Sequence, residues 1–328
     1  MACLALLTAG EALASTALAD TRVPGVRPEY QVVHYRTMKI EGVDIFYREA
    51  GPADGPLVVL LHGFPTSSYM FRNLIPALAD HYHVIAPDYP GFGQSSVPDR
   101  KTFDYGFAHF AQVIDELLSQ LGAKRYALYV QDYGAPVGYR LALRHPERIS
   151  ALVIQNGNAY EAGLREFWKP LKAYWADSSR EHREALRAGL TLQATRSQYV
   201  DGVSDPTRID PDNWLHDQTL LDRPGVDEIM LDLFRDYGTN VVLYSEFQAF
   251  FRSHRPPTLI VWGRNDVIFP AEGARAYLQD LPDAELHLLD TGHFALEDKG
   301  DEIAVLMHDF LNRKLGGSRT ASVRAPLN

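Results

Sequence analysis

Residues 127–134 read Ala-Leu-Tyr-Val-Gln-Asp-Tyr-Gly, and this stretch decides the fold of the chain. Residues 127–130 are apolar throughout, as in a strand that is buried on both faces. A helical pattern begins at Ala135, so a tight strand-to-helix turn places Asp132 at its apex. Such a turn pushes one side chain out of the sheet and into the crevice above it. Gly134, two residues on, allows the helix to pack closely against the strand.

The apolar signature of this strand recurs along the chain. Buried strands are expected at 57–61, 83–86, 152–154, 259–262 and 286–289, and an antiparallel hairpin at 32–38 and 43–48. Apolar residues spaced near 3.6 predict helices at 70–78, 107–121, 135–143, 271–281 and 303–315. Strands that alternate with helices indicate an α/β fold with a doubly wound, mostly parallel sheet.

This alternation stops in the segment 158–251, which is rich in aromatic and charged residues. Helical patterns occur there at 164–175, 180–194 and 225–236, without a buried strand run. An all-helical insertion between two strands predicts a cap over the carboxyl ends of the sheet. The expected domains are therefore a core at 30–157 and 252–315, a cap at 158–251 and a disordered tail at 316–328.

Composition excludes several classes of partner and cofactor. A net charge of -10 argues against nucleic acid or an anionic membrane surface as a partner. No apolar run approaches the ~20 residues that a membrane-spanning helix needs. Cys3 is the single cysteine, and the twelve histidines show no metal-ligand spacing such as H-E-x-x-H. We therefore expect neither a disulfide nor a metal nor a cofactor in the folded body.

The segment 1–29 is treated separately. Ala17-Leu18-Ala19 fits a small-x-small cleavage pattern, and residues 4–9 form a short apolar patch. The basic start of an export signal is absent, and Glu11 interrupts the apolar stretch. Two interpretations stay open: an export leader on a periplasmic protein, or a disordered leader on a cytoplasmic one.

Asp132 is the candidate nucleophile. No G-x-S-x-G sequence occurs, so a serine esterase has no candidate residue. A carboxylate attacks a saturated carbon that carries a leaving group, or a strained ring carbon, and forms an alkyl ester. The alternative is that Asp132 only caps the following helix. The residues found elsewhere in the chain favour the nucleophile.

A base and an acid follow in the order that a catalytic triad requires. His293 lies in Thr291-Gly292-His293-Phe294, directly after the last predicted strand, where the general base is expected. Asp266 lies after the strand 259–262 and can accept a hydrogen bond from His293. Asp290 and Glu297 are rivals, but a short loop would hold them beside their own backbone.

The loop His62-Gly63-Phe64-Pro65 follows the strand 57–61. We expect the backbone N–H of Phe64 and that of Tyr133 to form an oxyanion hole. These donors would stabilise the tetrahedral anion that forms when water attacks the ester.

These motifs in this order resemble the α/β-hydrolase fold family over about 30–315. Within that family the chain is similar to epoxide hydrolases and haloalkane dehalogenases, which share an aspartate nucleophile. The resemblance implies hydrolysis through an aspartyl-ester intermediate, without a cofactor. Aromatic residues at 64, 133, 167, 168 and 175 indicate an apolar pocket, so the expected partners are a small hydrophobic organic substrate and water.

The two subfamilies differ in how they hold the leaving group. Dehalogenases grip the halide with a tryptophan after the nucleophile and often an asparagine in the oxyanion loop, where this chain has Tyr133 and Phe64. Gln131 and the residues 65–69 nevertheless look like a dehalogenase. Epoxide hydrolases use two cap tyrosines, because a phenol can polarise and protonate the epoxide oxygen.

Tyr237 matches the second of these tyrosines by its separation from Asp266. Tyr174 is the choice for the first, with Tyr199 close behind, although cap tyrosines often serve only for packing. The favoured function is an epoxide hydrolase that gives vicinal diols, and the alternative is a haloalkane dehalogenase. The fold also hosts lyases, cofactor-free oxygenases and ligand receptors, which form a third alternative. The oligomeric state is open.

Overall fold

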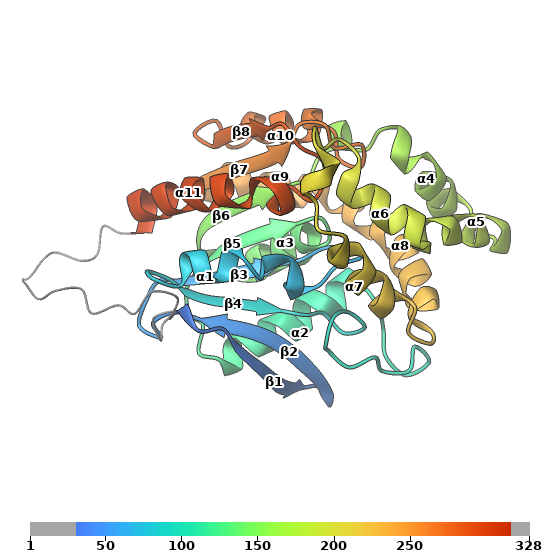
Figure 1. Cartoon of the computed structure of the whole chain (residues 1–328), viewed down its shortest axis with the longest axis horizontal. Coiled ribbons are helices and arrows are strands. Elements are labelled where there is room, and N and C mark those ends of the chain that lie inside the picture. Colours follow the sequence, from blue (N-terminus) through green and yellow to red (C-terminus); the bar gives the residue numbers. More distant parts are fainter. Residues whose placement is uncertain (1–30, 316–328) are drawn as a thin grey trace, which may run out of the picture.

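The computed structural model describes residues 31–315, and its centre is one eight-stranded sheet. The strand order is β1-β2-β4-β3-β5-β6-β7-β8 (Figure 1). The strands are β1 (His34–Ile40), β2 (Val43–Ala50), β3 (Leu57–Leu61), β4 (His83–Pro87), β5 (Tyr126–Gln131), β6 (Ile149–Gln155), β7 (Thr258–Gly263) and β8 (Glu285–Leu289). Only β2 pairs in an antiparallel manner, with β1 and β4. The predicted α/β fold with a mostly parallel sheet is confirmed.

The two faces of the sheet explain its apolar strands. On β5, Leu128 and Val130 belong to one hydrophobic cluster, and Ala127 and Tyr129 belong to the other. The first cluster includes side chains of α2 (Phe107–Gln120), α3 (Gly134–Arg144) and α10 (Ala271–Ala276), and the second includes those of α1 (Leu74–Leu78) and α11 (Leu296–Leu315). Helices therefore cover both faces, so residues that alternate in direction are all buried.

Several predicted boundaries are wrong. The first strand lies two residues later than the predicted 32–38, because its pairing starts beside the turn at Glu41-Gly42, with Ile40 opposite Val43. The predicted helix 70–78 is a 3-10 turn at 68–71 followed by α1, and the predicted helix 271–281 is α10 followed by a second 3-10 turn. The last helix begins at Leu296, not at 303, and is kinked at Lys299. Polar residues interrupt the apolar spacing in its first turns, so the sequence pattern did not predict them.

The segment between β6 and β7 contains helices and no strand. Its α-helices are α4 (Lys169–Ala176), α5 (Arg180–Ala185), α6 (Leu192–Val200), α7 (Pro211–Leu221), α8 (Val226–Val242) and α9 (Tyr244–His254). The prediction of a single helix at 180–194 is wrong, because the side chain of Thr191 caps the start of a separate helix, α6. Figure 1 shows α4 to α8 grouped beyond one end of the sheet. By contrast, α9 packs on α3, with Phe247 and Phe251 against Tyr139.

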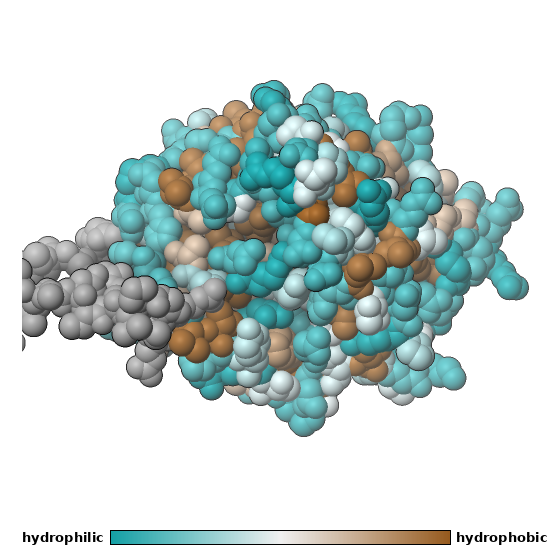
Figure 2. Space-filling model, viewed as in Figure 1, coloured by the Kyte–Doolittle hydropathy of each residue, from teal (hydrophilic) through white to brown (hydrophobic). Residues whose placement is uncertain are grey.

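The predicted leader and tail lie outside the residues that the structure describes. Among residues 31–315, no helix is both long and apolar enough to cross a membrane. Hydrophilic residues dominate the face in Figure 2, and hydrophobic residues form small separate patches on it. The apolar side chains of the sheet are thus mostly inside the molecule.

Candidate active site

A strained turn presents Asp132 at the end of β5. Its φ is +48°, in the left-handed region that residues other than glycine seldom adopt. The Asp132 N–H donates to the carbonyl of Asn156 on the neighbouring strand end (3.2 Å), and this bond holds the turn. A Cβ at Gly134 would lie 2.2 Å from the Leu61 carbonyl oxygen, so the start of α3 can approach β3 only with glycine there.

The Asp132 carboxylate faces two sets of groups. Oδ1 accepts a hydrogen bond from the Phe64 N–H (2.8 Å), and Oδ2 lies 3.8 Å from Nε2 of His293. Burial raises the pKa of Asp132; the nearby His293 and the N–H groups of Phe64 and Tyr133 offset only part of this effect. One oxygen therefore accepts the hydrogen bond of the oxyanion-loop N–H, while the other points toward the base.

The oxyanion loop is fixed by its histidine and its glycine. His62 Nδ1 lies 2.9 Å from the Gly63 carbonyl oxygen, and the Tyr89 N–H donates to His62 Nε2 (3.3 Å). Nε2 therefore accepts and Nδ1 donates, which requires a neutral ring, and burial lowers the pKa of His62. A Cβ at Gly63 would lie 2.3 Å from Cβ of Asp132, so glycine is needed for the loop to reach the carboxylate.

His293 and Asp266 form a buried pair. His293 Nδ1 lies 2.8 Å from Oδ2 of Asp266, a carboxylate that is fully buried. Burial alone would lower the pKa of His293, but the charge of Asp266, their hydrogen bond and the charge of Asp132 raise it above its usual range. The bond to Asp266 fixes the proton on Nδ1, so Nε2 carries the lone pair that accepts a proton during catalysis.

Asn156 holds Asp266 in place. Its side-chain N–H donates to Oδ2 of Asp266 (2.7 Å), and its Oδ1 accepts from the Gly263 N–H (3.0 Å). The Ile268 N–H donates to the other oxygen of Asp266 (2.8 Å). Asn156 has a φ of +43°, so β6, like β5, is followed directly by a left-handed residue. Sequence analysis did not predict this positioning contact of Asn156.

Gln131 is a second residue that sequence analysis missed. Its side-chain nitrogen lies 3.0 Å from His293 Nε2, so the amide donates to the lone pair that the base must use. Its Oε1 is buried and has no hydrogen-bond partner among the described residues. On the adjacent strand, Gln155 donates to the His293 carbonyl (3.0 Å). Two neighbouring glutamines thus contact the ring and the backbone of the base.

A cavity of about 380 Å³ lies above Asp132, between the core and the helices before β7. Its wall on the core side includes Phe64 and Tyr133. The opposite wall is mainly apolar and includes Phe167, Trp168, Leu171, Leu186 and Phe234. Polar side chains enter it from α6 and its end, at Ser197, Gln198 and Asp201. Such a cavity suits a small hydrophobic molecule held over the carboxylate.

A family model described as the alpha/beta hydrolase fold matches residues 56–300, which include the elbow, the oxyanion loop, Asp266 and His293. The chain belongs to the α/β-hydrolase fold family.

Individual relatives include both subfamilies that the sequence resembles. An uncharacterized hydrolase of Saccharomyces cerevisiae is 47% identical over 261 residues, covering 78% of this chain and 89% of the relative. A haloalkane dehalogenase of Mycobacterium marinum is 44% identical over 277 residues, covering 79% and 85%. The structure of the epoxide hydrolase CorEH aligns with this chain at a TM-score of 0.70 and 21% identity. The alignment covers 86% of this chain and 99% of that one, so the two proteins share the fold.

This α/β-hydrolase keeps its two predicted substrate tyrosines outside the cavity wall. The Tyr174 hydroxyl accepts a hydrogen bond from Arg183 (3.2 Å), and Tyr174 does not line the cavity. Tyr237 lies behind the wall, with its ring against Trp168, Trp175 and Tyr133. Its buried hydroxyl lacks a hydrogen-bond partner within residues 31–315. Neither tyrosine lines the cavity itself, but the ring of Tyr237 contacts Tyr133 and Trp168, which do.

The tryptophans near the cavity have no free N–H group. Trp168 Nε1 donates to the Ile268 carbonyl (2.7 Å), and Trp175 Nε1 donates to the Phe234 carbonyl (2.8 Å). Tyr133, at the position after the nucleophile, lines the cavity and makes no side-chain hydrogen bond in the described part of the chain. The Tyr133 phenol is therefore a donor side chain in the cavity wall, directly after Asp132 in sequence.

Proposed function

We propose that this α/β-hydrolase converts a hydrophobic epoxide into a vicinal diol through an alkyl ester on Asp132. The observation that carries the proposal is the carboxylate geometry. One Asp132 oxygen is held by the Phe64 N–H at 2.8 Å, and the other lies 3.8 Å from Nε2 of His293, whose Nδ1 is bound to Asp266. A carboxylate that is held at one oxygen can attack a strained ring carbon with the other.

In the first step, Oδ2 of Asp132 attacks a ring carbon and the carbon–oxygen bond of the epoxide breaks. The electron pair stays on the epoxide oxygen, which takes a proton from a phenol. Tyr133 is the proposed donor because it lines the cavity, and Tyr237 packs directly behind it. Burial raises the pKa of both phenols well above the ordinary value, so both hydroxyls keep their protons until a strong base such as the developing alkoxide takes one.

In the second step, His293 Nε2 removes a proton from water, and the water oxygen attacks the ester carbonyl. The tetrahedral anion forms on Oδ1, where the Phe64 N–H already points. Collapse expels the diol oxygen, which takes the proton from His293. The second proton of the water leaves the Asp132 carboxyl for solvent, which restores the carboxylate. The phenolate regains its proton from solvent, so one epoxide and one water give one diol.

Gln131 takes part in this step as a positioning residue. While His293 is neutral, the Gln131 amide N–H donates to Nε2. Once Nε2 carries a proton, it needs an acceptor, and Oε1 of the same amide has no partner among the residues described. Rotation of the amide would supply that acceptor, so Gln131 would follow the protonation state of the base.

The test compares styrene oxide with 1-bromohexane as substrates of the same protein. Loss of one hydroxyl in Tyr133→Phe is expected to lower kcat/KM for styrene oxide at least about 100-fold, while leaving the backbone N–H of residue 133 intact. Tyr174→Phe is the matched control, because its hydroxyl contacts Arg183, and its turnover should match the parent. Styrene oxide turnover that survives Tyr133→Phe and Tyr237→Phe together would refute the assignment of the donors.

A haloalkane dehalogenase is the second candidate, favoured by the 44% identical relative of that name. The absence of free indole N–H groups around the described cavity argues against it, since a departing halide needs hydrogen-bond donors. Bromide release from 1-bromohexane at a rate above that of diol formation would support the dehalogenase instead.

A further inference from the structure

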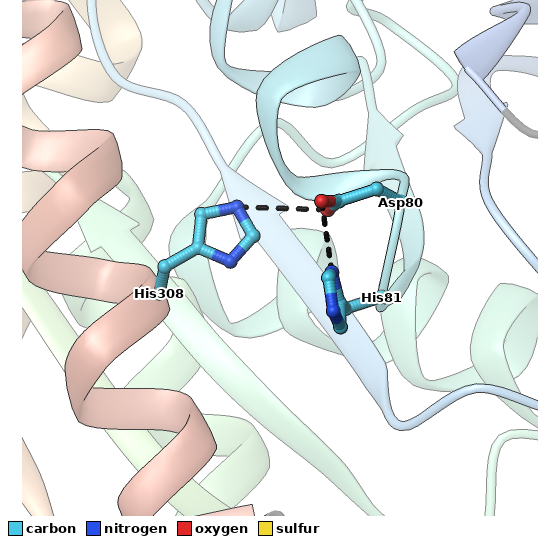
Figure 3. A group of neighbouring side chains, drawn as sticks. All are labelled: Asp80, His81 and His308. Atoms are coloured by element: carbon cyan, nitrogen blue, oxygen red, sulfur yellow. Dashed lines mark ion pairs between the residues drawn. The ribbon is translucent and has the colours of Figure 1, made fainter. Parts of the chain in front are cut away.

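Three metal-ligating side chains meet far from the catalytic centre, as Figure 3 shows. Asp80 and His81 lie in the turn between α1 and β4, and His308 lies on α11. Asp80 Oδ2 is 2.8 Å from His81 Nδ1, and Asp80 Oδ1 is 3.6 Å from His308 Nε2. In Figure 3, one nitrogen of each imidazole ring faces the carboxylate. The three ligand atoms all lie within 4.8 Å of one another.

We propose that Asp80, His81 and His308 bind a divalent transition-metal ion, with Zn²⁺ as the representative case. Two imidazole nitrogens and a carboxylate oxygen form a donor set that suits Zn²⁺ and Cu²⁺. Zinc ligands at 2.0–2.1 Å in a tetrahedron stand about 3.4 Å apart, so the present spacing needs adjustments of about 1 Å. The His81 side chain is exposed by 59%, that of Asp80 by 32% and that of His308 by 25%, which leaves room for water as a further ligand.

Binding at this site requires His308 to change its hydrogen bond. His308 Nε2 lies 2.6 Å from the Ala77 carbonyl oxygen and donates its proton there. A metal ion needs the Nε2 lone pair, so the ring proton must move to Nδ1, and the Ala77 oxygen becomes free to serve as a fourth ligand. Deprotonated ligands are required, so affinity rises with pH. A bound ion would also tie α11 to the turn after α1.

The test is a calorimetric titration of the full chain with zinc chloride alone at pH 6 and pH 8, together with thermal unfolding. We expect one ion per chain, tighter binding at pH 8 and a higher Tm with zinc. His308→Ala and His81→Ala should each weaken binding at least about tenfold and abolish the shift in Tm. A Cys3→Ser background should give the same result, because the thiol plays no part.

His182→Ala is the matched control. His182 also faces a carboxylate, with Nδ1 3.3 Å from Asp177, but no second histidine joins that pair in the described part of the chain. This variant should bind zinc like the parent. Absence of saturable zinc binding, or binding that survives both His308→Ala and His81→Ala, would overturn the proposal.

Discussion

Asp217 should make the stability of this protein depend on pH. It lies on α7 and is fully buried; its Oδ2 accepts a hydrogen bond from the Tyr199 hydroxyl, while its Oδ1 has no partner in the described structure. Burial raises the pKa of Asp217 from 3.8 to about 7, although the Tyr199 hydroxyl acts in the opposite direction. The folded chain therefore retains a proton that the unfolded chain releases above pH 4, and stability falls as pH rises toward 7.

Asp217→Asn removes the charge and keeps an acceptor for Tyr199. At 1.36 kcal/mol per pH unit, the charge costs about 4 kcal/mol above pH 7 and about 1.5 kcal/mol at pH 5. The variant should thus gain about 2–3 kcal/mol over the parent between pH 5 and pH 8. Urea unfolding at both pH values measures this difference. Asp212→Asn, an exposed position on the same helix, is the control and should show no such change.

An Asp217→Asn advantage that is equal at the two pH values would refute the reasoning. A loss of stability at both would do the same, because it would show that the carboxylate is stabilised rather than penalised in the fold.

Two further predictions concern the base. Gln131→Glu places a carboxylate about 3 Å from His293 Nε2, so the pKa of His293 should rise by at least about one unit. Since the neutral ring is the base, the acid limb of the pH profile of kcat should move to higher pH. Gln198→Glu, elsewhere in the cavity wall, is the control and should leave this limb in place. If the limb does not move in Gln131→Glu, the contact between Gln131 and His293 is contradicted. Asp266→Asn should slow ester hydrolysis at least about 1000-fold with little effect on alkylation, visible as a burst in stopped flow; an equal loss in both steps would contradict its role.

The fold was largely readable from sequence because the sheet is buried on both faces. Residues such as Leu128 and Tyr129 face different helical layers, so β5 appears as an unbroken apolar run. The helices were less readable where they contain polar or glycine positions. The start of α11 at Leu296 was missed because Lys299 and Gly300 interrupt its apolar spacing.

The site was readable where topology alone determines it. Asp132, Asp266 and His293 each follow a strand of the sheet, and the carboxyl ends of parallel strands meet at one edge. The contacts of Gln131 and Asn156 depend on side-chain direction at a strand end, which a single sequence does not specify. The places of Tyr174 and Tyr237 depend on how the helices α4 and α8 pack, and one of the two, Tyr174, turned toward Arg183 instead.

The central claim is that the Asp132 carboxylate becomes an ester during turnover, and trapping that ester tests it most directly. In His293→Asn the base is lost while Asp132 and the Phe64 N–H remain, so alkylation should proceed and hydrolysis should stop. Mass spectrometry of the variant treated with styrene oxide should find the peptide containing Asp132 heavier by one epoxide. An unmodified Asp132 peptide, with a parent that converts the same epoxide, would contradict the account.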